Sequence, residues 1–445
     1  MYQSVSHIID KTRISRVQFQ AIIICISLNA LDGFDVLAIS FASPGIAQEW
    51  GINRAELGIV LAMELIGMAI GSVLLGGTAD KYGRKPTIQI CLVLMTVGMF
   101  GSAMMTSVAG LLAFRFITGL GIGGMLAATN AMVAEFSNAK YRNLCVIVMA
   151  TGYPIGAILG GSIASVLLQS YSWHAVFYFG GIVTGLFILI VAFALPESPV
   201  YLSNKGDSGC LEKINGLLTR MGKPVIQALE KRSAPTTKLP FKVLFTGDLK
   251  RVTCLLVVAY FAQIMTFYFI LKWIPKIVVD MGFDPSQAGL VLVWANVGGA
   301  TGAILLGLLT SKVDLRMLLL PFLFMAFVMV AVFGRGYESL GALALVSAAT
   351  GFFTNSCVVG LYGLMAQKFP AQVRASGTGV VIGCGRGGAA LSPIIAGFLF
   401  SHDVSLQGVA LVMGTGSLVA LVAIFCLGGK RRSCAENSHL SSPAK

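Results

Sequence analysis

Charged residues are scarce in this chain. Only 11% of its 445 residues are Asp, Glu, Lys or Arg, whereas a typical soluble domain has about 25%. Hydrophobic residues make up 56% of the chain, and the mean hydropathy is +0.83. This balance excludes a soluble enzyme, whose surface needs charge, and a disordered chain, which contains few apolar residues.

Acidic residues, histidines and paired cysteines are also few. The chain has 19 acidic against 32 basic residues and 4 histidines, and none of its 9 cysteines follows the CxxC spacing of metal ligands. We therefore expect free thiols, and neither a secreted disulfide scaffold nor a metal site. The net charge of +13 does not indicate nucleic-acid binding, because the basic residues are distributed as membrane topology requires.

Long apolar runs are abundant instead. A helix needs about 20 mainly apolar residues to span a bilayer, and twelve runs of this kind can be counted. They are too long and too uniformly apolar for the alternating strands of a membrane barrel. We predict an all-α integral membrane protein whose spans begin near Gln18, Leu57, Thr87, Leu111, Leu144, Val176, Val252, Gln287, Met317, Leu340, Gly377 and Gln407.

The longest polar interruption divides these spans into six and six. We predict an N-terminal segment (1–17), a first six-helix bundle (18–194), a connecting loop (195–251), a second bundle (252–427) and a tail (428–445). The N-terminal segment is polar and the first apolar run is of spanning length, so no cleavable signal is expected. The connecting loop is basic and is expected to be unfolded and to contact lipid headgroups.

Lysines and arginines predict the orientation. With the N-terminus inside, 26 of the 32 fall on inside connections and 4 on outside connections, and Arg115 and Arg386 lie within spans. The outside residues are Arg54, Lys272, Lys276 and Arg335. By the positive-inside rule, both termini are expected in the cytoplasm.

An internal repeat supports the division into halves. The segment GGTADKYGRK (76–85) follows the second span, and GLLTSKVDLR (307–316) follows the eighth. A second pair consists of EFSNAKYR (135–142) and KFPAQVR (368–374). Two membrane halves related in this way are typical of secondary transporters.

These segments carry a family resemblance. GGTADKYGRK resembles the loop between helices 2 and 3 of the major facilitator superfamily, and RFITGLGIGG (115–124) resembles its helix 4 signature. PESPVYL (196–202) is similar to the segment after helix 6. Within that superfamily, LDGFD (31–35) resembles the DGxD motif of the aromatic acid:proton symporters, and GYPIG (152–156) and GRGGA (385–389) are similar to that family as well.

The resemblance implies the superfamily's fold, two six-helix pseudo-repeats, and a gating role for one loop. Its members use the loop after helix 2 as a cytoplasmic latch, with the aspartate near the start of helix 11. The corresponding residues here are Gly76, Asp80, Gly83, Arg84 and Lys85. The second copy departs from the pattern, because Ser311 stands where the acidic residue is expected.

Ionisable residues within the spans are candidates for proton coupling, because charge is costly inside a membrane. Asp32 and Asp35 are expected about 9–14 Å from an outer helix end near Phe41. A carboxylate near an arginine binds or releases a proton as its neighbours move. We predict that both aspartates carry the proton, with Glu64 and Arg115 assisting; alternatively, the aspartates only cap a helix break, and Arg115 is structural.

Arg386 is the candidate anion-binding residue. Its planar guanidinium matches a carboxylate in bidentate fashion, and the glycines of GCGRGG leave space beside it. A structural kink satisfied by backbone carbonyls is the alternative. Trp273 is expected as an interfacial anchor and His174 as an ordinary loop histidine. The predicted companions of Arg386 in the substrate site are Asn29, Tyr153, Gln263, Tyr268, Asn296 and Asn355.

The sequence thus predicts a proton-coupled symporter that imports an organic, preferably aromatic, carboxylate, with protons as the coupling ion and no other cofactor. A symporter for a sugar acid or dicarboxylate stays open, because Arg386 recognises the carboxylate and not the ring. A multipass enzyme or receptor lacks a supporting nucleophile or metal cluster. A drug antiporter would place a cation beside Arg386. We expect a monomer in the cell membrane, the inner one if bacterial, with lipid contacts and no nucleic-acid partner.

Overall fold

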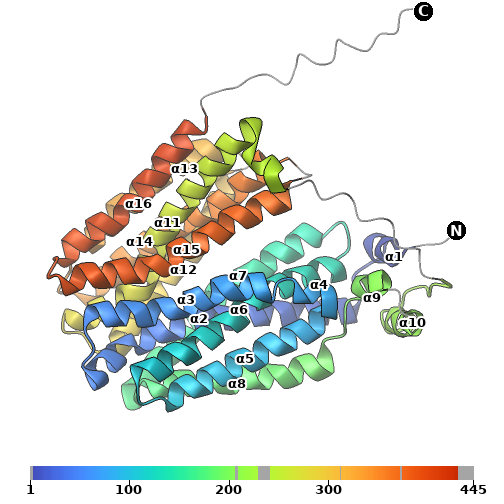
Figure 1. Cartoon of the computed structure of the whole chain (residues 1–445), viewed down its shortest axis with the longest axis horizontal. Coiled ribbons are helices and arrows are strands. Elements are labelled where there is room, and N and C mark those ends of the chain that lie inside the picture. The colour runs from blue at the N-terminus through green and yellow to red at the C-terminus, as the bar shows by residue number, and fades with distance from the viewer. Residues whose placement is uncertain (1–3, 206–208, 229–240, 311, 371–372, 429–445) are drawn as a thin grey trace, which may run out of the picture.

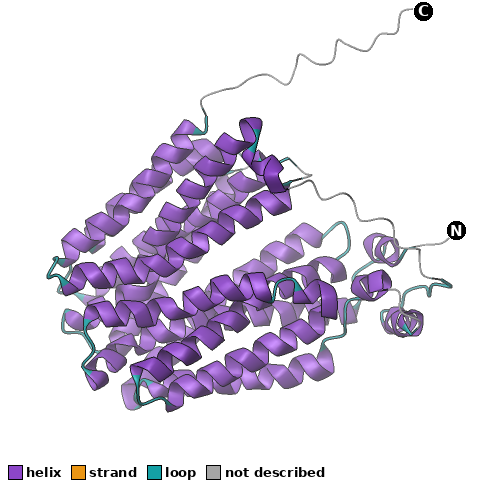
Figure 2. Ribbon diagram, viewed as in Figure 1, coloured by secondary structure: helices purple, strands orange, loops and turns teal. Residues whose placement is uncertain are grey.

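Twelve long helices form the protein, which is described here by a computed structural model. The described residues are 4–205, 209–228, 241–310, 312–370 and 373–428, and their regular structure is entirely helical (Figure 2). All twelve helices are long and apolar enough to span a membrane, as predicted. They are α2 (Arg16–Trp50), α3 (Arg54–Leu74), α5 (Arg84–Met104), α6 (Val108–Phe136), α7 (Arg142–Ser170), α8 (His174–Ala194), α11 (Gly247–Asp280), α12 (Pro285–Leu309), α13 (Leu315–Phe333), α14 (Leu340–Lys368), α15 (Arg374–Ser401) and α16 (Leu406–Cys426).

The long helices form two bundles, α2–α8 and α11–α16 (Figure 1). Corresponding helices pack closely in each bundle because glycines let the backbones approach. A Cβ added at Gly119 of α6 would lie 2.1 Å from the Glu64 carbonyl oxygen of α3. In the second bundle, a Cβ at Gly298 of α12 would lie 1.8 Å from the Ala348 carbonyl oxygen of α14. The two halves therefore share one packing scheme.

Helix α2 is longer than the sequence suggested. It begins after a capping box at Ser15, continues through Pro44 and ends at Gly51, whose φ of +60° is the left-handed conformation that glycine favours. The expected end near Phe41 is therefore wrong. Asp32 and Asp35 lie about 27 and 22 Å from the end at Trp50, which places them near mid-helix.

Helix α11 also extends beyond its expected end. Lys272 and Lys276, assigned above to an outside connection, lie within α11. Trp273 is not an interfacial anchor, since it is only 1% exposed and its ring lies 5.1 Å from that of Phe400. The sequence KWIPK resembles a helix end, but Pro275 is accommodated inside the helix.

Both ends of the described chain lie at one face of the molecule, here called the terminal face, where α2 begins and α16 ends. The bundles meet at the opposite face and diverge toward the terminal face (Figure 1). Toward the opposite face, one buried apolar cluster joins Leu57, Ile274 and Phe400 from both bundles. Toward the terminal face, the second bundle has its own cluster around Leu319 and Leu361, which the first bundle joins through Leu65 of α3.

One stripe of α15 shows the same divergence. A Cβ added at Gly397 would lie 2.5 Å from the Arg54 carbonyl oxygen of α3. Gly383 and Gly379 follow on the same side of the helix toward the terminal face, and no atom lies within 4 Å of a Cβ at either position. The bundles are thus closed at the opposite face and apart at the terminal face.

Short helices cover the terminal face of the first bundle. Their apolar sides form a small separate core, so the connecting loop contains folded structure where an unfolded connector was expected. An ion pair between Asp10 and Arg142 fixes this layer to the start of α7. The helices of this layer are α1 (Val5–Lys11), α9 (Pro199–Lys205) and α10 (Cys210–Arg220). Of the other short elements, α4 (Thr78–Tyr82) packs on α5, and the 3₁₀ helix η1 (Phe241–Phe245) packs on α11 of the second bundle.

Candidate functional site

Arg115 of α6 is fully buried in the first bundle. Its guanidinium donates hydrogen bonds to Ser102 Oγ and Thr118 Oγ1, both at 2.9 Å, and lies 4.7 Å from the centre of the Phe177 ring. These contacts fix the side chain from α5, α6 and α8. Nη1 makes no hydrogen bond among the described residues and points toward Glu64.

Glu64 of α3 lies between two cations. Its Oε2 is 3.9 Å from Arg115 Nη1 and 3.9 Å from Lys272 Nζ, and all three side chains are fully buried. Neither carboxylate oxygen accepts a hydrogen bond from a described residue. The ammonium of Lys272 instead donates to the Val36 carbonyl of α2. The carboxylate of Glu64 is therefore neutralised by two nearby cations, although neither cation forms a hydrogen bond with it.

Asp32 and Asp35 are buried on α2 beside this cluster, with exposed fractions of 3% and 0%. Thr184 Oγ1 donates to Asp35 at 3.4 Å, while Oδ1 of each aspartate has no hydrogen-bond partner in the described chain. The helix is continuous through Gly33, so no break is present for the aspartates to cap. Buried carboxylate oxygens without partners are costly, so this pair is a candidate for proton binding.

Arg386 lies near the middle of α15 and joins the two bundles. Its Nη1 donates to the Met68 carbonyl of α3 at 3.2 Å, and the side chain is half-buried. Its charge lies within electrostatic range of Asp32 and Tyr268. The other guanidinium donors have no hydrogen-bond partner among the described residues, which leaves them available to an anion.

Two tyrosines face each other, one from each bundle, and the one on α11, Tyr268, lies within electrostatic range of Arg386. Tyr153 of α7 has a buried hydroxyl without a hydrogen bond to any described residue, and it lies close to the Tyr268 hydroxyl of α11. Phe267 packs edge-on against Tyr268, with ring centres 5.5 Å apart. Tyr268 therefore connects Arg386 with Tyr153, and the contact of all three residues with substrate stays a prediction.

The remaining predicted substrate residues are engaged in helix contacts. Their amide nitrogens donate to backbone carbonyls. Asn29, Gln263 and Asn355 bond to a neighbouring helix, Gln263 also accepts a hydrogen bond from Ser417, and the bond of Asn296 lies within α12. Their contact with substrate stays a prediction. The pairs are Asn29 with Met149 (2.7 Å), Gln263 with Thr354 (3.1 Å), Asn296 with Leu292 (2.9 Å) and Asn355 with Gly299 (2.8 Å).

The loop signature forms a compact network at the terminal face. Arg84 makes a bidentate pair with Glu135 at 2.8 and 3.1 Å, and Gly83 adopts a φ of +115° at the start of α5. Asp80 pairs with Arg84 at 3.2 Å, and its side chain is 80% exposed. The expected approach of Asp80 to the start of α15 is therefore not seen here, because the bundles are apart at this face. Gly76 lies against the Ser72 carbonyl, and Lys85 Nζ donates to Ala192 O at 2.7 Å.

Glu197 completes this network and was not singled out from the sequence. Its carboxylate accepts the backbone N–H groups of Arg84 (3.1 Å) and Lys85 (3.2 Å), which caps the N-terminus of α5. Burial raises the pKa of Glu197, and these hydrogen bonds oppose that rise. Its place in PESPVYL was the available signal.

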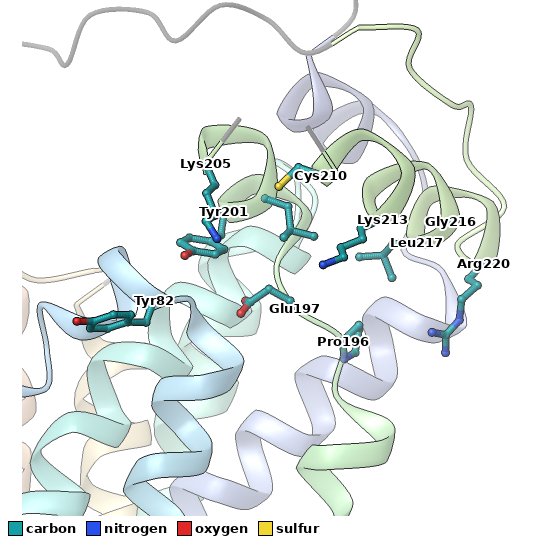
Figure 3. A pocket seen from close by; sticks show the side chains of 12 residues that line it. Tyr82, Pro196, Glu197, Tyr201, Lys205, Cys210, Lys213, Gly216, Leu217 and Arg220 are labelled. Atoms are coloured by element: carbon teal, nitrogen blue, oxygen red, sulfur yellow. The ribbon is translucent and has the colours of Figure 1, made fainter. Parts of the chain in front are cut away.

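A pocket of about 670 Å³ opens beside Glu197, between the loop signature and α9–α10 (Figure 3). Tyr82, Pro196, Tyr201 and Leu217 supply apolar surface. Lys213 and Arg220 of α10 add positive charge to the lining. This pocket lies at the terminal face and is separate from the charges near mid-span.

The described residues contain no cluster of three or more histidines, cysteines or acidic groups suited to a metal ion. The described cysteines are free thiols, as predicted, and Cys434 lies outside the described residues. His174 stacks on Trp173 at 3.7 Å between ring centres.

Comparison with known proteins gives a match over most of the chain. The family model described as Major Facilitator Superfamily matches residues 25–334 and 253–440. The 4-hydroxybenzoate transporter PcaK of Acinetobacter baylyi is 29% identical over 425 residues, which cover 94% of this chain and 93% of the relative. The gallate transporter of Pseudomonas putida is 27% identical, over 95% of this chain and 94% of the relative. The benzoate transport protein of Acinetobacter baylyi is 26% identical, over 96% of this chain and 93% of the relative.

Solved structures show the same fold. The xylose transporter XylE from E. coli, in a partially occluded inward open conformation, has a TM-score of 0.72 at 18% identity and covers 93% of this chain and 98% of its own. A bacterial homologue of the human lysosomal transporter Spinster gives a TM-score of 0.73 at 14% identity, over 94% of this chain and 97% of its own.

Proposed function

The chain belongs to the major facilitator superfamily and is a secondary transporter, not an enzyme, and we propose that it is a symporter importing an aromatic carboxylate with protons. The observation that carries this proposal is Arg386, a half-buried cation near mid-span with unused donors. A guanidinium in such surroundings binds a carboxylate strongly, because little water competes for it.

The aromatic preference rests on the surroundings of Arg386. Tyr268 lies within electrostatic range of Arg386, Tyr153 faces Tyr268 from the other bundle, and Phe267 extends the apolar wall. Rings provide flat apolar surface, and tyrosine hydroxyls add hydrogen bonds to substituents. The printed names of the relatives refer to 4-hydroxybenzoate, gallate and benzoate, which supports an aromatic acid over a sugar acid or dicarboxylate.

Proton coupling is assigned to Asp32 and Asp35. Both are buried, each has a carboxylate oxygen without a partner among the described residues, and cations approach them from both bundles. When the bundles rearrange, the distance to these cations changes, and with it the proton affinity. Inward movement of a proton down its gradient then accumulates the acid.

Orientation follows from the corrected positions of the basic residues. With Lys272 and Lys276 inside α11, Arg54 and Arg335 remain at the opposite face, against the 26 basic residues that the sequence assigns to the inside connections. We place the terminal face in the cytoplasm, in the bacterial inner membrane if the source is bacterial. Lys213 and Arg220 beside the pocket of Figure 3 are proposed to contact lipid headgroups, and the transporter is proposed to act as a monomer.

Reconstitution into liposomes tests the proposal. An imposed inward proton gradient should drive accumulation of labelled 4-hydroxybenzoate, and unlabelled benzoate or gallate should compete. Glucuronate and succinate should not compete at equal concentration. Uptake that does not depend on the proton gradient would exclude symport with protons. Competition by glucuronate or succinate, with none by benzoate or gallate, would exclude the aromatic preference.

A further inference from the structure

Lys272 has no place in the function proposed so far. It belongs to the second bundle, yet its ammonium is buried in the first, 3.9 Å from Glu64 and bonded to the Val36 carbonyl. We propose that Lys272 substitutes for the transported proton: it neutralises the acidic cluster when the opposite face closes and leaves that cluster to a proton when the face opens. This inference deepens the proposed symport and rests on it.

The charge balance of the cluster carries the argument. In the first bundle, Asp35 and Glu64 share Arg115, so the three ionised groups have a net charge of −1. A buried net charge is costly unless a counter-ion compensates it. Lys272 supplies that counter-ion from the other bundle, and it can do so only while the opposite face is closed.

The geometry suits an exchange better than a permanent bond. Both ion pairs of Glu64 are 3.9 Å long, and neither of its oxygens has a hydrogen bond from a described residue. A permanent structural pair would be expected to have short, fully satisfied contacts. The loose contact lets the ammonium withdraw without breaking a hydrogen bond to the carboxylate.

The transport cycle then has a simple order. With the opposite face open, Lys272 is withdrawn and the cluster takes up a proton from outside. Closure brings Lys272 back, and the proton leaves toward the terminal face, where the bundles are apart. No covalent bond other than that to the proton forms or breaks, and withdrawal of Lys272 breaks its hydrogen bond to the Val36 carbonyl.

Several other groups surround this exchange. They lie on every helix that packs around Glu64 and enter the same pH dependence: Asp32 and Asp35 on α2, Arg115 on α6, Tyr153 on α7, Lys272 and Tyr268 on α11, and Arg386 on α15. Lys272 is distinguished from Arg386 by its depth, since it is 0% exposed and Arg386 is half-buried.

A distance measurement on the purified full chain in lipid nanodiscs tests the proposal without substrate. Spin labels attached through ketone-bearing amino acids at Gln48 and His402, both exposed near the opposite face, report its opening by electron resonance. The parent protein should be closed at neutral pH and open as the pH falls. In Lys272→Gln, the midpoint of opening should move up by about 1–3 pH units, because the competing cation is gone.

Charge-matched variants separate exchange from structure. Glu64→Gln alone should open the face even at neutral pH, since Lys272 then brings an excess positive charge. Adding Lys272→Gln should close it again, because Asp35 and Arg115 balance each other. Lys272→Arg should behave like the parent. Lys276→Gln, which removes the same charge one turn away where Lys276 pairs with Asp280, should leave the midpoint unchanged.

Two results would overturn the proposal: an unchanged midpoint in Lys272→Gln, or a double variant no more closed than Glu64→Gln. If Lys272→Gln does not fold, the double variant and Lys272→Arg still decide. If no carboxylate is transported but the Lys272-dependent opening is present, the proposed substrate fails and the exchange stands. If transport is normal but the opening does not depend on Lys272, the exchange fails and the proposed substrate stands.

Discussion

The two bundles share one packing scheme but carry opposite charges. The first bundle buries Asp32, Asp35 and Glu64, whereas among the described residues of the second no carboxylate is buried, and the charges within its spans include Lys272, Lys276 and Arg386. A carboxylate cluster binds protons, and a guanidinium binds anions. The pseudo-repeat has therefore diverged so that each half is suited to one of the two species whose transport is proposed above.

The largest effect should come from removing a proton-binding group in the first bundle. Asp32→Asn and Asp35→Asn should each abolish accumulation driven by a proton gradient while exchange of labelled for unlabelled substrate continues, because a carboxamide keeps the shape but cannot titrate. Uptake and exchange in the same liposomes measure this. Asp403→Asn is the matched control, since Asp403 is exposed and its left-handed φ of 56° is tolerated by Asn. Normal accumulation in either buried variant would remove that aspartate from the coupling path.

The complementary change in the second bundle should affect binding. Arg386→Ala should weaken binding of the carboxylate by about 2–5 kcal/mol, and Arg386→Lys by less but clearly, since an ammonium lacks the bidentate fork. Titration calorimetry measures this, with exposed Arg335→Ala as the control. A neutral amide analogue of the substrate should bind the variants and the parent alike. Equal losses for acid and amide would instead indicate a distorted α15.

If both bundles share one packing scheme, replacing the corresponding close-contact glycine should destabilise the protein equally in each bundle. Gly119→Val and Gly298→Val each place side-chain atoms against a neighbouring backbone carbonyl, and overpacking of this kind costs about 1–3 kcal/mol. The melting temperature should fall in both variants by similar amounts. Gly307→Val is the control, because no atom lies within 4 Å of a Cβ there. A loss confined to one bundle would contradict the shared scheme.

The smallest effect is expected at Glu197, which caps α5 in the first bundle. Since its pKa is raised on folding, its contribution to stability is present at low pH and declines as the pH rises from the ordinary carboxyl value through the raised one. Glu197→Gln should therefore make the melting temperature depend less on pH above the ordinary carboxyl value of about 4, while the amide oxygen still accepts a backbone N–H. An equally steep profile in the variant would assign that pH dependence to another group.

The sequence revealed the parts of the site that stand out locally. Arg386 and Asp35 interrupt apolar runs, and intramembrane charge is a functional signal by itself. Lys272 was missed because KWIPK resembles the end of a helix, and its burial depends on Glu64, which lies far away in the chain and in the other bundle. The predicted ends of α2 and α11 were wrong for a similar reason. Pro44 and Pro275 are tolerated inside these helices only because neighbouring helices support them.

The position of Trp273 gives the protein an optical property. Its indole is buried next to Lys272, lies 5.1 Å from the Phe400 ring, and its Nε1 donates to no described residue. An indole in dry surroundings emits at shorter wavelength than one in contact with water, so opening of the opposite face should shift its emission to the red. Trp273→Phe would remove this component from the emission of the 4 tryptophans. The unlabelled transporter thus contains a native fluorescent reporter beside the lysine on which its closure is proposed to depend.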